Sequence, residues 1–268
     1  MPPTRAALYA ANAAVIVVTV RAVLVAPPPL LWAISAFFAY VALVLAGVFA
    51  LRLRVFTDAI VRGPKGARGV VLTFDDGPDP EWTPRVLDTL DAAGAKATFF
   101  VIGRKVEAHP EIVREIVRRG HAVELHSYAH DRLFSLRGER RVRADLERGL
   151  AAIERVAGAR PTLFRPPIGH TNPIIARVAD ALDLTVIGWS VSGRDGLRGA
   201  NPAVVTARVR GAAEDGAIVL LHDAAERGDH EPAGPRALPD ILRAIDAANL
   251  RVVPLATWLG DQAEGSST

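Results

Sequence analysis

Residues 30–51 contain no charged side chain, and this run constrains the chain more than any other feature of its sequence. A helix that crosses a bilayer needs about 20 consecutive, mainly apolar residues, so the run is long enough to span one. A second apolar stretch, residues 8–26, precedes it; Arg21 lies near its end, where a long side chain can reach the membrane interface. The three prolines at 27–29 cannot continue a helix. The sequence therefore predicts two transmembrane helices, over about 8–26 and 30–51, joined into a hairpin.

Two other interpretations of the apolar stretches stay open. The first stretch could be a secretory signal peptide with Arg5 in its basic leading segment, and the second would then remain as an anchor. The two stretches could also be buried core helices, although an uncharged run of this length is uncommon in a soluble core.

The charges that flank the hairpin predict its orientation. Asp58 is the only acidic residue among the basic residues that follow the second stretch, which are Arg52, Arg54, Arg62, Lys65 and Arg68. Only Arg5 precedes the first stretch. The side richer in Lys and Arg usually faces the cytoplasm, so this bias places the body of the chain on the cytoplasmic side of a bacterial inner membrane.

Composition excludes several kinds of function. The 32 basic and 29 acidic residues leave a net charge of +3, and no basic block is interleaved with aromatic residues, so nucleic-acid binding is not expected. The chain has no cysteine, which rules out disulfides, thiolate zinc sites and thiol catalysis. The oligomeric state is not indicated.

From Gly69 onward, short apolar runs alternate with amphipathic stretches, a pattern typical of a parallel α/β sheet. About seven strands are expected, at Val70–Phe74, Ala97–Val101, His121–Leu125, near Leu163, and at Thr185–Gly188, Ala217–Leu221 and Arg251–Val253. Helices are expected after Thr83, as the N-cap before Pro84, over about Pro110–Arg119 with Ile112, Ile116 and Val117 on one face, and through Val142, Leu146, Leu150 and Ile153. We expect an anchor over residues 1–56, an α/β domain over 57–260 and a disordered tail over 261–268.

Two of the strands are followed by side chains that can bind a metal. Asp75 and Asp76 end the first strand before a Gly-Pro turn, and adjacent side chains on extended backbone point in different directions, so the two carboxylates can have different tasks. His126 and His130 follow the third strand at a spacing that puts both imidazoles on one face of a helical turn. Two histidines and a carboxylate form a common catalytic metal site with open positions for water and substrate. Taken separately, a solvated Asp-Asp turn or a pair of surface histidines would explain each motif equally well.

Two further motifs lie at strand ends. Arg165 opens an Arg-Pro-Pro-Ile-Gly loop, which on its own is most simply a rigid turn. His222 directly follows the apolar strand near residue 220 and is a candidate general acid, or else a core histidine. In a parallel α/β fold all four motifs would share the rim formed by the carboxyl ends of the strands.

These four segments, in this order, resemble the polysaccharide deacetylases of the NodB-homology family, carbohydrate esterase family 4, over about Gly69 to Leu259. The resemblance implies a distorted (β/α) barrel and a hydrolase that removes an N-acyl group, expected to be acetyl, from an amino sugar. It implies a divalent metal, most often Zn²⁺, with Co²⁺ or Mn²⁺ as alternatives, held by Asp76, His126 and His130.

The same resemblance assigns roles to other residues. Asp75 is the expected catalytic base and His222 the general acid that protonates the leaving amine. Arg165 is expected to orient Asp75, with Asp195 as the partner of Arg165. The backbone N–H of Ile168 would stabilise the oxyanion, and Leu220 would line the pocket for the acyl methyl group.

The chain also departs from the family pattern. Ile168 stands where Tyr or Phe is frequent, and Ser192 and Gly196 replace an Asp and a Trp of the fourth motif. The groove is therefore expected to stack less strongly on a long sugar polymer. Glu124 stands in a segment that often reads Gly-Asn. Among the other histidines, His170 is expected near substrate, whereas His109, His121 and His230 are expected to be structural or solvent-exposed.

Three functions are consistent with these motifs. The first is deacetylation of a cell-envelope glycan. The second is the same chemistry on a lipid-linked amino sugar at the cytoplasmic membrane face, which the hairpin, the charge bias and the reduced groove favour. The third is a catalytically silent glycan-binding protein, which would be expected to have lost a metal ligand or Asp75; neither is lost. The expected partners are thus an amino-sugar glycan or lipid-linked sugar, and membrane lipid.

Overall fold

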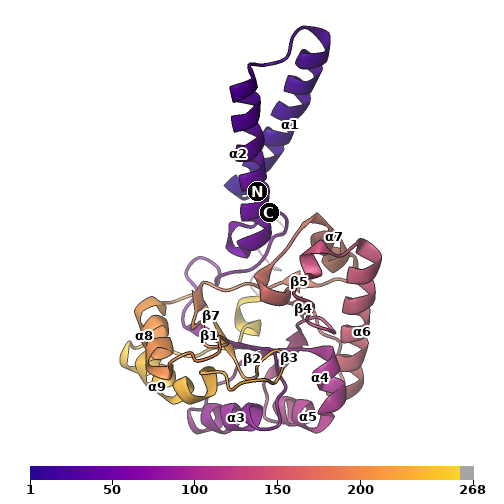
Figure 1. Ribbon diagram of the computed structural model, residues 1–268. Helices are drawn as coiled ribbons and strands as arrows, with labels where there is room; N and C mark the ends of the chain where they lie inside the picture. The colour runs from indigo at the N-terminus through magenta and orange to yellow at the C-terminus, as the bar shows by residue number, and fades with distance from the viewer. Residues whose placement is uncertain (260–268) are drawn as a thin grey trace.

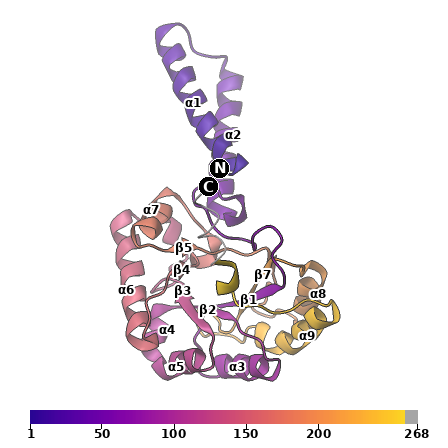
Figure 2. The same ribbon diagram turned by 180° about the vertical axis from the view of Figure 1, so that it is seen from behind.

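The computed structural model describes residues 1–259, in which a helical hairpin stands away from an α/β body (Figure 1, Figure 2). Residue 260 and the tail expected over 261–268 lie outside the described residues. The hairpin consists of α1 (Pro3–Leu24) and α2 (Leu30–Phe49), so the first helix begins five residues earlier than the apolar pattern indicates. Both helices are long and apolar enough to cross a membrane, and 6% of each apolar window is buried. They are therefore not a buried core pair, and their insertion into a membrane stays a prediction.

Hydrogen bonds and an ion pair connect the two helices of the hairpin to each other and to the body. Tyr40 donates a hydrogen bond from its hydroxyl to Asn12 Oδ1, at 2.9 Å, between the two helices. At the base, Arg5 pairs with Asp58 (2.9 Å) and donates from Nε to the carbonyl of Val55 (3.1 Å). A short 3₁₀ turn, η1 (Leu51–Leu53), leads from α2 into the body. The hairpin therefore has a defined direction relative to the body.

The body is built on one parallel sheet of seven strands in the order β5-β4-β3-β2-β1-β7-β6. The strands are β1 (Val70–Asp75), β2 (Thr98–Val101), β3 (Ala122–Leu125), β4 (Leu163–Phe164), β5 (Thr185–Val186), β6 (Val191–Ser192) and β7 (Ala217–His222). Within residues 1–259 the edge strands β5 and β6 do not pair with each other, so the sheet is a curved, incomplete barrel. The expected α/β fold with seven parallel strands is confirmed.

One of the seven strands differs from expectation. Residues 251–253 do not form a strand; they make a single bridge to Val70, through the bonds Val70 N–H to Arg251 C=O (2.7 Å) and Val253 N–H to Val70 C=O (2.9 Å). The seventh strand is instead β6, which is too short and too polar in its flanks for a periodicity argument to detect.

Helices on the outside of the sheet cover its apolar surface (Figure 1). They are α3 (Trp82–Ala92), α4 (Gly103–Ala108), α5 (Pro110–Arg118), α6 (Glu139–Ala157), α7 (Pro173–Ala181), α8 (Pro202–Ala212) and α9 (Gly234–Ala247). Each of the longer ones buries an apolar stripe; in α6 it is Val142, Leu146, Leu150 and Ile153, as the helical spacing predicts. In α5, Val117 is partly exposed, so only Ile112 and Ile116 of the predicted face are in the core.

The start of α3 shows that Thr83 is not the N-cap that the sequence predicts. The helix begins at Trp82, and the Asp79 carboxylate accepts hydrogen bonds from the backbone N–H groups of Glu81 (2.8 Å) and Trp82 (3.0 Å). Thr83 is buried inside the first turn and donates to Asp223 Oδ2 at 2.5 Å. Thr83 therefore connects the start of α3 to the residue that follows His222 at the end of β7.

Candidate metal centre and active site

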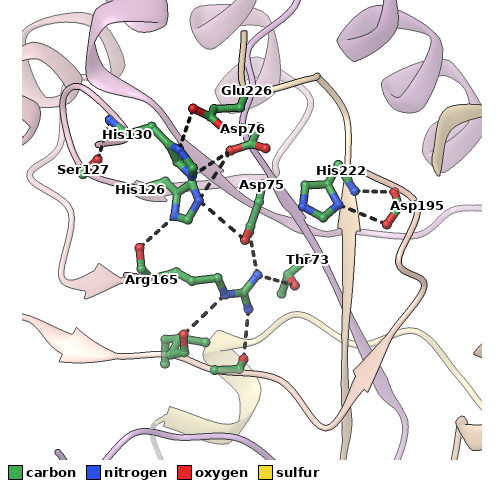
Figure 3. Close-up of polar contacts among 12 residues, drawn as sticks. Thr73, Asp75, Asp76, His126, Ser127, His130, Arg165, Asp195, His222 and Glu226 are labelled. Atoms are coloured by element: carbon green, nitrogen blue, oxygen red, sulfur yellow. Dashed lines mark hydrogen bonds and ion pairs between the residues drawn. The ribbon is translucent and has the colours of Figure 1, made fainter. Parts of the chain in front are cut away.

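The site forms where the central strands end. Strands β1 and β7 run side by side in a register that pairs Asp75 with His222, while β2 lies on the other side of β1 and β3 lies beside β2. Because the strands are parallel, the residues at their carboxyl ends meet on one rim. Figure 3 shows the predicted residues converging there.

Three of them form a group that can hold a metal ion. One ligand atom from each of Asp76, His126 and His130 lies within 4.8 Å of the others, and all three side chains are buried. Asp76 Oδ1 is 3.5 Å from His126 Nε2 and 3.3 Å from His130 Nε2, and within residues 1–259 it has no hydrogen-bond donor. A buried carboxylate oxygen without a donor is costly unless a cation satisfies it, so these residues fit a divalent metal. Asp76 has a φ of 73°, which turns its side chain away from that of Asp75.

The two imidazoles reach the site from a loop, which corrects the predicted helical turn. Positive φ values at Ser127 (65°) and His130 (51°) bend the chain, and Ser127 Oγ accepts a hydrogen bond from the backbone N–H of His130 at 2.9 Å. His126 Nδ1 lies 2.7 Å from the carbonyl oxygen of Arg165, which directs Nε2 toward Asp76. Burial, followed by the neighbouring His130, holds the pKa of His126 well below its usual value. A neutral imidazole with a free Nε2 is the form that binds a metal.

Arg165 is fully buried and fixes Asp75 (Figure 3). Its NH1 donates to Asp75 Oδ1 at 2.6 Å and to Thr73 Oγ1 at 2.8 Å, and its other donors reach the carbonyls of Ile187 and Gly188. The guanidinium group therefore orients the Asp75 carboxylate, and each of its three nitrogens donates to an acceptor. Burial raises the pKa of Asp75, whereas Arg165 and His222 act in the opposite direction. The result is a carboxylate that is fixed in place and more basic than an exposed one.

His222 is paired with Asp195, which corrects the expected partner of that carboxylate. Asp195 Oδ1 lies 3.0 Å from His222 Nδ1, and Asp195 Oδ2 accepts from the backbone N–H of His222 at 2.7 Å. Burial lowers the pKa of His222, but the charge of Asp195 and its hydrogen bond outweigh burial and raise the pKa to about 10. Asp195 therefore keeps the imidazole protonated and does not contact Arg165, which pairs with Asp75.

A cavity of about 470 Å³ opens over these groups. Leu220 lines it and is almost fully buried, whereas Ile168 lines it with a half-exposed side chain on a backbone of positive φ (51°). Both expected substrate-contacting positions therefore face the cavity, together with Trp189. His170 does not line it; its ring packs edge-on against Phe49 of the hairpin, with ring centroids 4.7 Å apart.

Two cavity residues escaped the sequence analysis. Glu226 lies 3.5 Å from His130 Nδ1 and is held by Arg132 at 2.6 Å. His230, expected to be structural, lines the cavity, with Nε2 at 3.0 Å from the carbonyl oxygen of Gly196. Glu226 follows the His222 motif by four residues, but a lone glutamate in a loop gives no signal of a contact to a histidine nearly a hundred residues earlier.

Comparisons with known proteins agree with this geometry. The family model described as polysaccharide deacetylase matches residues 62–187. The chain is 33% identical over 193 residues to a peptidoglycan-N-acetylglucosamine deacetylase of Bacillus cereus. The matched region covers 72% of this chain and 69% of that protein. It is 36% identical to a chitooligosaccharide deacetylase of a Bradyrhizobium species, over 71% of this chain and 90% of that protein. The solved structure of the Bc1960 peptidoglycan N-acetylglucosamine deacetylase is similar with a TM-score of 0.69 and 32% identity, over 74% of this chain and 91% of that one.

Proposed function

This chain belongs to the polysaccharide deacetylase family and is a hydrolase of amide C–N bonds, and we propose that it removes the acetyl group from an N-acetylated amino sugar of a cell-envelope glycan. The observation that carries the proposal is that one rim brings together a triad that can hold a metal and two pairs, Asp75 with Arg165 and His222 with Asp195. The relatives named above act on peptidoglycan or chitooligosaccharide, which supports an amino-sugar substrate.

We propose Asp76, His126 and His130 as the ligands of a divalent cation. Two imidazole nitrogens and one carboxylate oxygen suit Zn²⁺, and Co²⁺ or Mn²⁺ accept the same donors. When bound, the cation polarises the amide carbonyl and lowers the pKa of water at the site. Lys105 supports this ligand set from outside, since its ammonium group donates to the backbone carbonyl of Asp76 at 2.7 Å.

Two residues of the chain exchange protons with the substrate in this proposal. Asp75 accepts a proton from the attacking water, because its carboxylate is fixed by Arg165 and its pKa is raised by burial. His222 donates a proton to the amide nitrogen as the C–N bond breaks, because Asp195 keeps the imidazole charged. The two groups end adjacent strands in register, so they can approach one amide from its two sides.

The walls of the cavity complete the proposal. Leu220 offers an apolar contact for the acyl methyl group, and the backbone N–H of Ile168 is proposed to donate to the carbonyl oxygen as negative charge develops on it.

We also propose that residues 1–56 anchor the protein in a membrane and that the catalytic domain starts at residue 57.

The experiment that tests the proposal uses the full-length protein, purified in detergent and loaded with Zn²⁺. Release of acetate from N-acetylglucosamine oligomers is expected, and Asp75→Asn is expected to abolish it while the circular dichroism spectrum and Zn²⁺ binding are kept. Sugar binding without any acetate release would instead favour the catalytically silent alternative. Fusions of alkaline phosphatase or green fluorescent protein to the carboxyl terminus would identify the membrane face on which the domain lies.

A further inference from the structure

A second cavity, of about 400 Å³, lies where the hairpin meets the catalytic cavity. One side is formed by Phe49, Leu51 and Arg52 at the end of the hairpin, and the other by Ile168, Trp189 and Arg194 of the body. The last three residues line the catalytic cavity as well. The two cavities therefore adjoin at these residues, close enough for one extended molecule to occupy both. We call the second cavity the junction groove.

Among residues 1–259, the lining of the junction groove carries only positive charge. Its charged residues there are Arg52 and Arg194, and none of the described lining residues is a carboxylate. Within residues 1–259 neither arginine makes an ion pair or a side-chain hydrogen bond. By contrast, Arg5 and Arg54 at the same junction share one carboxylate, since they lie 2.9 Å and 3.9 Å from Asp58. Unpaired guanidinium groups on a groove favour a phosphate or carboxylate, whose oxygens can accept two parallel N–H bonds.

The position of the groove distinguishes between these anions. Phe49 is the last residue of α2 and is 58% exposed, so the groove lies at the base of the apolar hairpin. The loop after β4 is attached there, because the backbone N–H of Thr171 donates to the carbonyl of Val48 at 3.1 Å and His170 packs on Phe49. Figure 1 shows the hairpin rising from this end of the body. With the hairpin in a bilayer, the groove lies at the level of the lipid phosphates, where unpaired arginines are favourable.

We propose that the junction groove binds the phosphate that links an amino sugar to a membrane lipid, so that the substrate is a lipid-linked N-acetylated amino sugar that enters the catalytic cavity from the membrane surface. This inference rests on the proposed deacetylase chemistry, and it names a lipid-linked amino sugar as the substrate in place of a finished envelope glycan. The lipid chain lies along the exposed apolar residues of the hairpin, the phosphate contacts Arg52 and Arg194, and the sugar extends past Trp189 toward His222. Gly196 lines the catalytic cavity without a side chain, which suits a short sugar better than a long polymer that needs aromatic stacking surfaces.

The test compares three substrates with the Zn²⁺-loaded, full-length protein in detergent micelles: an alkyl-phosphoryl N-acetylglucosamine, the neutral alkyl N-acetylglucosaminide of the same chain length, and N-acetylglucosamine 1-phosphate. We expect kcat/KM to be highest for the first. Arg52→Gln and Arg194→Gln are each expected to reduce the preference for the phosphoryl substrate over the neutral one by roughly 10-fold, the usual worth of a charge-assisted hydrogen bond. Arg160→Gln is the matched control, because Arg160 is exposed at the opposite end of β4 and is expected to keep the preference.

The other outcomes distinguish failure of the proposed phosphate site and lipid-linked substrate from failure of the deacetylase function. Equal kcat/KM for the phosphoryl and neutral alkyl substrates, or a preference that survives both substitutions, would overturn the junction groove as a phosphate site and leave the deacetylase function intact. Equal turnover of N-acetylglucosamine 1-phosphate and its alkyl form would overturn the lipid-linked substrate. Failure of all three to release acetate, while N-acetylglucosamine oligomers do, would mean that the enzyme acts on polymer. Failure of every substrate would overturn the proposed function itself.

Discussion

Replacing Asp195 with asparagine is expected to lower the pH at which the enzyme loses activity in alkaline solution. The carboxylate makes two contacts with His222, to Nδ1 at 3.0 Å and to the backbone N–H at 2.7 Å. Asparagine has one acceptor oxygen in place of two. When that oxygen keeps the bond to the backbone N–H, the amide NH₂ faces Nδ1, and the imidazolium N–H loses its acceptor. The substitution therefore removes both the charge and the hydrogen bond that favour the protonated form.

The size of the effect follows from the pKa of His222. Burial lowers this pKa, and the charge and hydrogen bond of Asp195 overcome burial and raise it to about 10. Without them the pKa is expected to fall to about 6.5 or below. At pH 8 the protonated fraction then decreases from ~99% to at most ~3%, a loss of roughly 30-fold in a step that needs the imidazolium. At pH values below its lowered pKa the variant is expected to recover most of its activity, because His222 is then protonated in both enzymes.

The assay is the dependence of kcat/KM on pH, from acetate release by the Zn²⁺-loaded protein. A bound cation lowers the pKa of His222 in both enzymes, so the measured quantity is the displacement of the alkaline limb between them. Asp246→Asn, on the exposed face of α9, removes the same charge far from the cavity and serves as the control. An alkaline limb at the same pH in Asp195→Asn and wild type, or an equal loss at every pH, would refute the reasoning.

Three further predictions test the surroundings of the site. Glu226→Gln is expected to weaken Zn²⁺ binding about 10-fold, measured by competition with a chelator, because the Glu226 carboxylate lies 3.5 Å from His130 Nδ1 and its negative charge makes that imidazole a stronger ligand. Gly234→Ala is expected to lower the free energy of unfolding by about 1–3 kcal/mol and to shift the alkaline limb downward, because a Cβ at this position would lie 2.3 Å from Asp195 Oδ2. Glu124→Gln is expected to raise the melting temperature at pH 8 and leave it unchanged near pH 4.5. Burial raises the pKa of Glu124 to about 7. Between about pH 4.5 and pH 7 the native state therefore binds more protons than the unfolded state. The wild type loses stability as pH rises through this range, by at most about 3 kcal/mol. A melting temperature of Glu124→Gln that follows the wild type across this range would contradict that account.

Glutamine at position 124 is an informative replacement because it keeps the local hydrogen bonds. Glu124 Oε2 accepts from the backbone N–H groups of Thr162 (3.1 Å) and Leu163 (2.8 Å), which connects β3 to the start of β4. The amide oxygen of glutamine can accept the same two bonds without a charge. This role also explains one departure from the family pattern: the long side chain spans a gap between two strands, two residues before His126 on one of them and two residues before Arg165 on the other.

The sequence by itself determined the features that depend on neighbours along the chain. Apolar runs longer than a bilayer span indicated both hairpin helices, and a strand followed by a metal-binding or proton-transferring residue indicated Asp75, Asp76, His126 and His222. These patterns are readable because burial and strand direction constrain residues within one element. The three-residue metal group then required only that parallel strands end on the same rim.

Only the tertiary structure decided which distant side chains meet. Asp195 pairs with His222 and not with Arg165, because β6 is inserted beside β7 and carries the loop of Asp195 to that edge of the sheet. The exchange of residues 251–253 for β6 as the seventh strand has the same origin, since a two-residue strand is stabilised by its neighbours and not by its own pattern. The contact of Phe49 with His170, which sets the hairpin against the rim and creates the junction groove, joins segments more than a hundred residues apart. Such contacts depend on packing between elements, and no local preference of the chain encodes them.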